Sequence, residues 1–272
     1  MSSQASPKGV VTVKNLRKYK ATGKKFTSLT AYDAAFAAVL DEAGIDVVLV
    51  GDSLGMVVQG LDTTIPVSMD DIIYHSQTVA RGLQRAMLMV DMPFMSYATE
   101  EQALHNASRL MKEGGAQIVK LEWGALQLGM VRRFTECGIP VCAHLGLTPQ
   151  TYFKMGGYKV QGRDDLTASR MLDDALALEE AGADVLLLEC VPRELAKKIT
   201  ESVSTPVIGI GAGPDVDGQV LVLYDILDIA PGKRTRFSKN YMRNNGAIQD
   251  AIKQYDQEVR DGTFPSDEHS FE

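Results

Sequence analysis

Three stretches of the sequence repeat one pattern that ends in a carboxylate. They read EAGIDVVLVGD, KEGGAQIVKLE and EEAGADVLLLE, and they end at Asp52, Glu122 and Glu189. In each copy a glycine follows the end of an expected helix, and a short, mostly apolar run comes next. Such a run without regular polar alternation is typical of a strand that is buried on both faces. We therefore predict that these acids lie at the carboxyl ends of parallel strands.

Three further residues with reactive side chains occupy similar positions. Asp91 follows the run AMLMV, His144 closes IPVCAH, and Lys120 lies two residues before Glu122. Residues two apart in a strand point to the same side, so Lys120 should face the same way as Glu122. If the strands are parallel, all these groups converge at one end of the sheet.

Four crowded carboxylates repel one another in a low dielectric, unless a cation neutralises them or some stay protonated. Oxygen ligands suit Mg²⁺, which takes a few protein carboxylates and leaves positions for water or substrate oxygens. Zinc is disfavoured because the four histidines of the chain show no zinc-ligand spacing. We interpret Asp52, Asp91 and Glu122 as metal ligands, directly or through water.

Glu189 is predicted to act differently from the other acids. It follows a leucine run and precedes Cys190, Val191 and Pro192, which are the driest surroundings of the four. Desolvation weakens the charged form of a carboxyl group, which favours proton abstraction, so we interpret Glu189 as a general base.

Structural roles for single members of this group remain open. An acid at a strand end is often the N-cap of the next helix, and a lone histidine is often structural. Lys120 has an alternative role as the ion-pair partner of Glu122, which is compatible with substrate binding. The combination of four acids, a lysine and a histidine nevertheless favours a functional site.

The elements that must position these residues alternate between strand and helix. Thr12 should cap a helix over 13–21, a first strand should cover 26–30, and a helix over 34–43 should follow. The same alternation continues to PVIGIGAG. Only PDVDG separates that strand from the last candidate strand, QVLVLYDIL, so the seventh helix should be reduced to a turn.

This order predicts an α/β fold, namely a (β/α)8 TIM barrel with an N-terminal capping helix and a shortened seventh helix. We expect one domain over residues 1–272, with 1–9 and 263–272 flexible, and a final helix with Tyr241, Ile248 and Ile252 on its apolar stripe. Barrel active sites lie at the carboxyl ends of the strands, where the predicted polar residues converge. The glycine-rich GIGAGPDVDG lacks the Lys-Ser/Thr of a phosphate-binding P-loop, so tight turns explain it better.

Composition excludes some classes of function. The 272 residues carry a net charge of −7 and no block of Lys or Arg, which argues against nucleic acid as a partner. No window approaches the roughly 20 apolar residues of a membrane span, and the N-terminus shows no signal-peptide core. The three cysteines suit buried free thiols in a reducing compartment. We therefore expect a cytoplasmic protein that binds small molecules.

At the level of whole motifs, the sequence resembles the 3-methyl-2-oxobutanoate hydroxymethyltransferase family, also called ketopantoate hydroxymethyltransferase. Nine motifs occur in order between about residues 10 and 245: LTAYDAAFA, VGDSLGMVVQG, TTIPVSMDDIIYH, VDMPF, VKLE, AHLGLTPQ, GGYKVQGR, LLLECVP and IGIGAGPDVDGQVLV. A match of this length is far more specific than a single glycine loop.

The resemblance implies an Mg²⁺-dependent transferase on a (β/α)8 barrel. Such an enzyme moves a hydroxymethyl group from 5,10-methylenetetrahydrofolate to 3-methyl-2-oxobutanoate, giving 2-dehydropantoate and tetrahydrofolate, the first step of pantothenate and coenzyme A synthesis. The implied positions are Asp52, Asp91 and Glu122 around the metal, Ser53 and Lys120 on the keto acid, His144 lining the site, and Glu189 as proton acceptor. Asp52, Asp91 and His144 would also lie against the substrate. The resemblance further implies a homo-oligomer, expected to be a decamer. The folate should lie in the mouth of the barrel beside the loops, and we expect residues 156–163 to form a mobile lid over it.

Three residues depart from the family pattern. Trp123, Met95 and Ala143 stand where glycine is usual, and the first two should place larger side chains near the mouth of the site. Two rival functions also remain. One is an Mg²⁺-dependent 2-oxo-acid carbon–carbon lyase of the isocitrate lyase and phosphoenolpyruvate mutase type, and the other is a non-catalytic barrel that binds keto acids.

Overall fold

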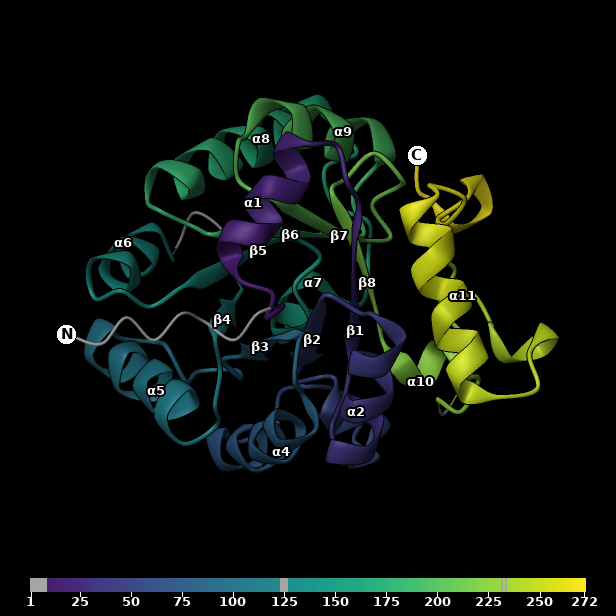
Figure 1. Cartoon of the computed structure of the whole chain (residues 1–272). Coiled ribbons are helices and arrows are strands. Elements are labelled where there is room, and N and C mark those ends of the chain that lie inside the picture. Colours follow the sequence, from purple (N-terminus) through teal and green to yellow (C-terminus); the bar gives the residue numbers. More distant parts are fainter. Residues whose placement is uncertain (1–8, 123–126, 231, 233) are drawn as a thin grey trace.

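The protein folds as a closed parallel barrel surrounded by helices (Figure 1). The computed structural model describes residues 9–122, 127–230, 232 and 234–272. Within these residues every strand pairs in parallel with its neighbours in the sequence, and β1 closes the barrel against β8. The strands are β1 (Phe26–Thr30), β2 (Val47–Val50), β3 (Met87–Asp91), β4 (Ile118–Leu121), β5 (Val141–Gly146), β6 (Val185–Glu189), β7 (Val207–Ile210) and β8 (Gly218–Leu221). The predicted (β/α)8 barrel is confirmed.

The longer helices pack on the outside of the barrel, where their apolar faces cover the strands (Figure 1). The helices are α1 (Val13–Ala21), α2 (Ala34–Ala43), α3 (Leu54–Val57), α4 (Met69–Gly82), α5 (Glu100–Lys112), α6 (Leu128–Glu136), α7 (Tyr152–Met155), α8 (Asp165–Glu180), α9 (Arg193–Ser202), α10 (Leu223–Ile226) and α11 (Ile248–Arg260). Short 3₁₀ turns cover Pro149–Thr151, Met242–Asn244 and Asp267–His269.

Helix α1 covers the amino-terminal end of the barrel. Its residue Leu16 is completely buried. Lys20 pairs with Asp217, just before β8, at 2.7 Å, and Arg17 pairs with Asp184, just before β6, at 2.9 Å. These partners lie at the entry to their strands, so the predicted N-terminal capping helix is confirmed.

The connection from β7 to β8 contains only turns and bends, so the seventh helix is indeed reduced. The last strand is shorter than QVLVLYDIL, because it ends at Leu221 and the chain turns into α10. At that point the backbone N–H of Leu223 donates to Oγ1 of Thr30 at 3.0 Å. The acceptor of this hydrogen bond is a side chain of β1 and not a backbone carbonyl, so the backbone pairing of β8 with β1 ends before Leu223.

The C-terminal segment differs from the sequence-based expectation. Residues 263–272 were expected to be flexible, but Phe264, His269 and Ser270 are buried. The backbone N–H of Arg193 donates to the carbonyl of Phe271 at 2.9 Å, which fixes the segment beside α9. Of the expected flexible N-terminus, residues 1–8 lie outside the described residues.

Helix α11 begins later than the predicted apolar stripe. Tyr241 is buried but precedes the 3₁₀ turn Met242–Asn244, so it is not on the helix. The buried face of α11 consists of Ala251, Ile252, Tyr255 and Val259. The helix is held by Tyr255, whose hydroxyl donates to carbonyl oxygens of both β1 and β8.

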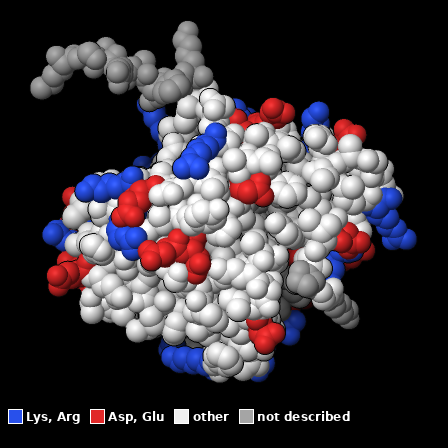
Figure 2. Space-filling model, turned by 90° about the horizontal axis from the view of Figure 1, so that it is seen from below, with Lys and Arg blue, Asp and Glu red and all other residues white. Residues whose placement is uncertain are grey.

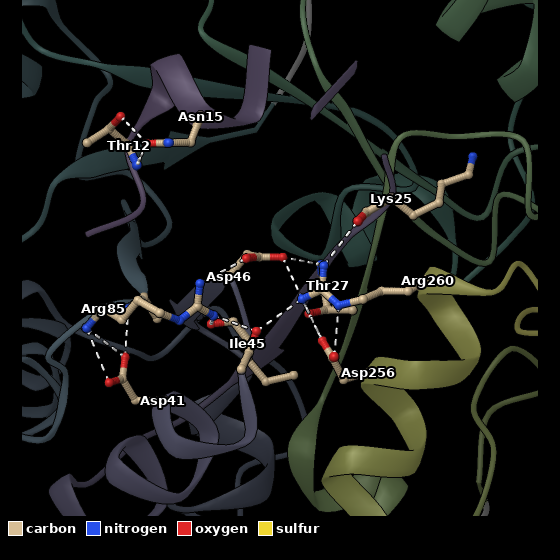
Figure 3. Close-up of polar contacts among 12 residues, drawn as sticks. Thr12, Asn15, Lys25, Thr27, Asp41, Ile45, Asp46, Arg85, Asp256 and Arg260 are labelled. Atoms are coloured by element: carbon tan, nitrogen blue, oxygen red, sulfur yellow. Dashed lines mark hydrogen bonds and ion pairs between the residues drawn. The ribbon is translucent and has the colours of Figure 1, made fainter. Parts of the chain in front are cut away.

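A polar cluster below the strands joins α11 to the barrel (Figure 3). Asp46, which is 1% exposed, accepts from Arg85 at 3.1 Å through one carboxylate oxygen and from Arg260 at 2.9 Å through the other. Arg260 also pairs with Asp256 on its own helix at 2.8 Å. Two arginines thus neutralise one buried acid at the end of the barrel opposite to the carboxyl ends of the strands.

On the outer surface, the face shown in Figure 2 carries acidic and basic side chains interspersed, without a concentrated basic patch. None of the helices in the described part of the chain is long and apolar enough to span a bilayer. Cys142 and Cys190 are buried free thiols as expected, but Cys137 is exposed because it caps the end of α6.

Candidate active site

A cavity of about 740 Å³ opens at the carboxyl ends of the strands. Its volume lies within the range of small-molecule sites. The predicted site residues all line it: Asp52, Ser53, Asp91, Lys120, Glu122, His144 and Glu189. Their convergence follows from the fold, because parallel strands of a barrel end on one face.

The predicted acids and His144 each lie at or near the carboxyl end of a different strand. Asp91 is the last residue of β3 and Glu189 is the last residue of β6. Glu122 directly follows β4, and Asp52 lies two residues after β2. His144 lies within β5, where the register pairs it with Leu187 of β6.

Lys120 lines the cavity together with these acids, and its ion-pair partner is Asp91. The ammonium lies 2.8 Å from Oδ1 of Asp91, because the β3–β4 register sets the two residues side by side. The alternative role considered for Lys120, as the ion-pair partner of Glu122, is therefore replaced by a pair with Asp91. Burial lowers the pKa of Lys120, but the charges of Asp91, Glu122 and Asp52 outweigh it and raise the pKa overall.

The acids carry more negative charge than this lysine can neutralise. Burial raises the pKa of Asp52 well above its usual range, and the carboxylates of Asp91 and Glu122 raise it further. Within the described residues, no group of three or more His, Cys, Asp or Glu side chains lies close enough together to hold a metal ion. Asp52, Asp91 and Glu122 nevertheless all line the same cavity.

Gln150 connects two of these acids and was not among the predicted residues. Its side-chain amide donates to Oδ2 of Asp52 at 2.9 Å, and its backbone N–H donates to Oε2 of Glu122 at 3.0 Å. The hydroxyl of Tyr97 donates in turn to Oε1 of Gln150 at 2.5 Å. The signal in the sequence was the motif AHLGLTPQ, which ends in this glutamine, but a neutral amide is not recognisable as part of an acidic site without its contacts.

His144 is completely enclosed between two acids. Its Nδ1 lies 3.5 Å from Oε1 of Glu122, and its Nε2 lies 3.4 Å from Oε2 of Glu189. Both ring nitrogens and Oε1 of Glu122 are buried without a hydrogen-bond partner among the described residues. Buried polar atoms normally have partners, so these atoms are available to a bound ligand or water.

Glu189 is not the driest of the four acids, in contrast to the prediction. Its side chain is 15% exposed, whereas that of Glu122 is 1% exposed. The preceding leucines are buried in the barrel, but Glu189 is the last residue of β6 and its side chain reaches the cavity. Directly after it, Cys190 adopts a left-handed conformation with φ of 49°, which turns the chain away from the strand.

The residues that depart from the family pattern have different environments. Met95 is 48% exposed and is not among the residues lining the cavity, so its side chain is not part of the cavity wall. Its φ of 61° places it in the left-handed region that glycine adopts without strain. Ala143 is buried within β5. Trp123 lies outside the described residues.

The segment predicted to form a lid borders the cavity. Tyr158, Lys159 and Val160 line it, and the segment begins at Gly156 and Gly157, both with positive φ. The far end is attached to the barrel, where the N–H of Gln161 donates to the carbonyl of Cys190 at 2.9 Å. The segment therefore forms part of the cavity wall, and its movement as a lid stays a prediction.

Solved structures with the same fold include enzymes of low sequence similarity. Phosphoenolpyruvate phosphomutase from Streptomyces platensis matches with a TM-score of 0.60 and 14% identity, over 80% of this chain and 83% of that chain. Phosphonopyruvate hydrolase in complex with oxalate and Mg²⁺ matches with a TM-score of 0.59 and 15% identity, over 96% and 93% of the two chains. At these identities the likeness shows the fold alone.

Sequence comparison is far more specific. The chain is 58% identical over 261 residues to 3-methyl-2-oxobutanoate hydroxymethyltransferase of Alkalilimnicola ehrlichii, covering 96% of this chain and 94% of that protein. The enzyme of the same name from Shewanella loihica is also 58% identical over 261 residues, with 96% and 98% covered. Residues 10–267 match the profile of one enzyme family. The chain belongs to the ketopantoate hydroxymethyltransferase family.

Proposed function

We propose that the protein transfers a hydroxymethyl group from 5,10-methylenetetrahydrofolate to 3-methyl-2-oxobutanoate, giving 2-dehydropantoate and tetrahydrofolate. The observation that carries this proposal is the cavity in which Lys120, three clustered acids and the separate acid Glu189 face one space. This arrangement supports binding of an anionic keto acid beside a base. The family membership supports the identity of both substrates.

Lys120 and Ser53 are the proposed contacts of the keto acid. The buried ammonium of Lys120 supplies a positive charge for the carboxylate or the 2-oxo group. The Oγ of Ser53 lies 2.8 Å from the hydroxyl of Tyr32, which fixes the serine side chain at the cavity wall. Fixed donors of this kind orient a substrate with little loss of rotational freedom on binding.

The acids fit a hard divalent cation. Burial and the charges of Asp91 and Glu122 raise the pKa of Asp52, and Oε1 of Glu122 is buried without a hydrogen-bond partner among the described residues. A cation would neutralise such groups. We propose that Asp52, Asp91 and Glu122 hold Mg²⁺, directly or through water, because this ion uses few protein carboxylates and retains other oxygen ligands. When bound, Mg²⁺ would act as a Lewis acid on the 2-oxo group and increase the acidity of the neighbouring C3 proton.

Glu189 is the proposed general base. It accepts the C3 proton, and the electron pair left on C3 forms the new bond to the methylene carbon of the donor. Water supplies the hydroxyl oxygen. The C3 proton and one proton of this water are transferred to the two nitrogens that release the methylene group. His144 lies 3.4 Å from Glu189, where its ring would attract the carboxylate when the ring is protonated.

The first step can be tested without the donor. Exchange of the C3 proton of 3-methyl-2-oxobutanoate is followed by NMR in D₂O with Mg²⁺, for the native protein and for Glu189→Gln. We expect metal-dependent exchange in the native protein and its loss in the variant. If the native protein binds the keto acid but shows neither exchange nor transfer with the donor present, it is a binding protein and the proposal is wrong.

A carbon–carbon lyase is the second candidate, because the solved structures of similar fold include 2,3-dimethylmalate lyase, described as a member of the PEP mutase/isocitrate lyase superfamily. Cleavage of a 2-hydroxy or 2-oxo diacid in the absence of folate would support it. We also propose that the protein is a cytoplasmic homo-oligomer, with ten subunits as the family resemblance implies. Sedimentation velocity would measure the number of subunits.

A further inference from the structure

The cavity has a second group of lining residues that the proposed chemistry at the carboxylates does not use. Arg236, Phe237 and Phe271 line the cavity in addition to the polar cluster. We refer to these three residues as the aromatic wall. Phe271 comes from the C-terminal segment, and the other two come from the loop after α10.

The aromatic wall lies next to the strand that carries the proposed base. Glu189 of β6 is in register with Ile210 of β7, and Gly211 follows Ile210. A Cβ atom on Gly211 would lie 3.0 Å from the ring of Phe271 and 3.1 Å from the ring of Phe237. These distances are too short for an ordinary side-chain contact, so glycine at this position admits both rings.

Close packing against neighbouring segments also accounts for the second and third glycines of the sequence GIGAG, Gly211 and Gly213. Gly211 and Gly213 both have positive φ, of 60° and 77°. A Cβ on Gly213 would lie 2.7 Å from Cβ of Arg193. The backbone N–H of Arg193 donates a hydrogen bond to the carbonyl of Phe271. The two glycines therefore do more than form a tight turn, because they let the C-terminal segment approach the end of β7.

The wall is held in place by contacts between the loop after α10 and the C-terminal segment. The rings of Phe237 and Phe271 meet edge to face at 6.5 Å between centroids. The guanidinium of Arg236 lies 5.4 Å from the centroid of Phe271, and its Nε donates to the carbonyl of Glu268 at 3.2 Å. The result is a surface with two rings and one positive charge.

Two rings and a cation match a flat aromatic ligand that carries negative charge. A branched keto acid has no ring, and a cavity of about 740 Å³ is of the size that takes drug-sized ligands. We propose that the aromatic wall is the subsite for the aromatic part of the one-carbon donor, separate from the polar cluster that takes the keto acid. This inference rests on the proposed function and assigns the C-terminal segment a part in donor binding.

The test compares the two substrates in Phe271→Ala, Phe271→Tyr and Arg236→Gln. Equilibrium binding of tetrahydrofolate and the KM for 5,10-methylenetetrahydrofolate report the donor subsite, and donor-free C3 exchange reports the keto-acid site. We expect Phe271→Ala to weaken donor binding about five- to tenfold, with exchange changed less than about twofold, as typical for loss of one aromatic contact. Phe271→Tyr should retain near-native binding, and Arg236→Gln should weaken donor binding and reduce its dependence on salt.

Tyr74→Ala is the matched control, because Tyr74 is a well-exposed aromatic on α4 that does not line the cavity. Unchanged tetrahydrofolate binding in Phe271→Ala would overturn the inference, and so would an equal loss of exchange and donor binding. A native protein that shows neither exchange nor transfer would instead show that the proposed function has failed, and the inference with it. Thermal unfolding of each variant confirms that it is folded.

Discussion

The ammonium of Lys120 lies 2.8 Å from Oδ1 of Asp91, and both side chains are almost completely buried at the floor of the cavity. Such a pair has lost its hydration, so each charge depends on the other. Asp52 and Glu122 lie close enough to raise the pKa of Lys120 as well. The lysine thus stabilises a cluster of acids, in addition to its proposed contact with the substrate.

Replacement of Lys120 by methionine should therefore destabilise the fold. The variant leaves Asp91 buried without its partner, and breaking a buried pair costs about 3–5 kcal/mol. Urea unfolding of both proteins measures the difference, and we expect Mg²⁺ to restore stability more in the variant than in the native protein. Equal stability of the two proteins without metal would show that Asp91 has another source of neutralisation.

Gln150→Ala should weaken binding of a divalent cation. The variant removes the donor that orients Asp52, while the backbone contact to Glu122 can remain. We expect the affinity for Mn²⁺, measured by electron paramagnetic resonance, to fall about tenfold. A loss of this size is typical when a residue that hydrogen-bonds to a metal ligand is removed. Gln161→Ala is a control, since the side-chain amide of Gln161 donates to the backbone carbonyl of Lys159 and not to one of the clustered acids. An unchanged Mn²⁺ affinity would show that Asp52 is positioned without Gln150.

Asp46→Asn should cost stability and leave the chemistry intact. Asp46 neutralises Arg85 and Arg260 at the amino-terminal end of the barrel, away from the cavity (Figure 3). We expect a loss of about 3–5 kcal/mol in urea unfolding, with normal activity per folded molecule. The control Glu136→Gln removes a surface pair with Arg133 and should change stability by less than about 1 kcal/mol. Similar values for the two variants would contradict this prediction.

Asp225 should make stability fall as pH rises. Burial raises the pKa of Asp225 to about 6, from the usual 3.8. Between these values the folded state binds a proton that the unfolded state has released. The free energy of unfolding therefore decreases as pH rises from about 3.8 to about 6. Asp225→Asn should gain about 1–2 kcal/mol at pH 7, allowing for partial exposure, and nothing below pH 3.8. Unfolding curves across this range measure it; a gain independent of pH would point to another cause.

Met95→Gly should stabilise the protein slightly. Met95 is held at φ of 61°, which glycine adopts without steric cost, and its side chain is largely exposed. Because relief of strain is partly offset by the greater freedom of glycine in the unfolded chain, we expect a gain of about 0.5–1 kcal/mol. Thermal unfolding measures the change. A loss of stability would show that the methionine side chain makes contacts that outweigh the strain.

The sequence by itself determined the barrel and the acids at the ends of its strands that line the cavity. Apolar runs of strand length alternate with helices, and helix ends such as Gly44 and Gly182 adopt the expected left-handed conformation. In a parallel barrel every strand ends on the same face, so acids at strand ends such as Asp91 and Glu189 must converge. These features depend on local patterns, which the sequence records directly.

The tertiary structure alone decided which groups contact one another. Strand register set Lys120 beside Asp91 rather than Glu122, and the approach of a separate loop brought Gln150 onto two acids. The C-terminal segment looked loose because its burial depends on distant partners such as Gly211 and Arg193. Contacts between segments far apart in the chain leave no period or spacing in the sequence, so they appear only when the chain has folded.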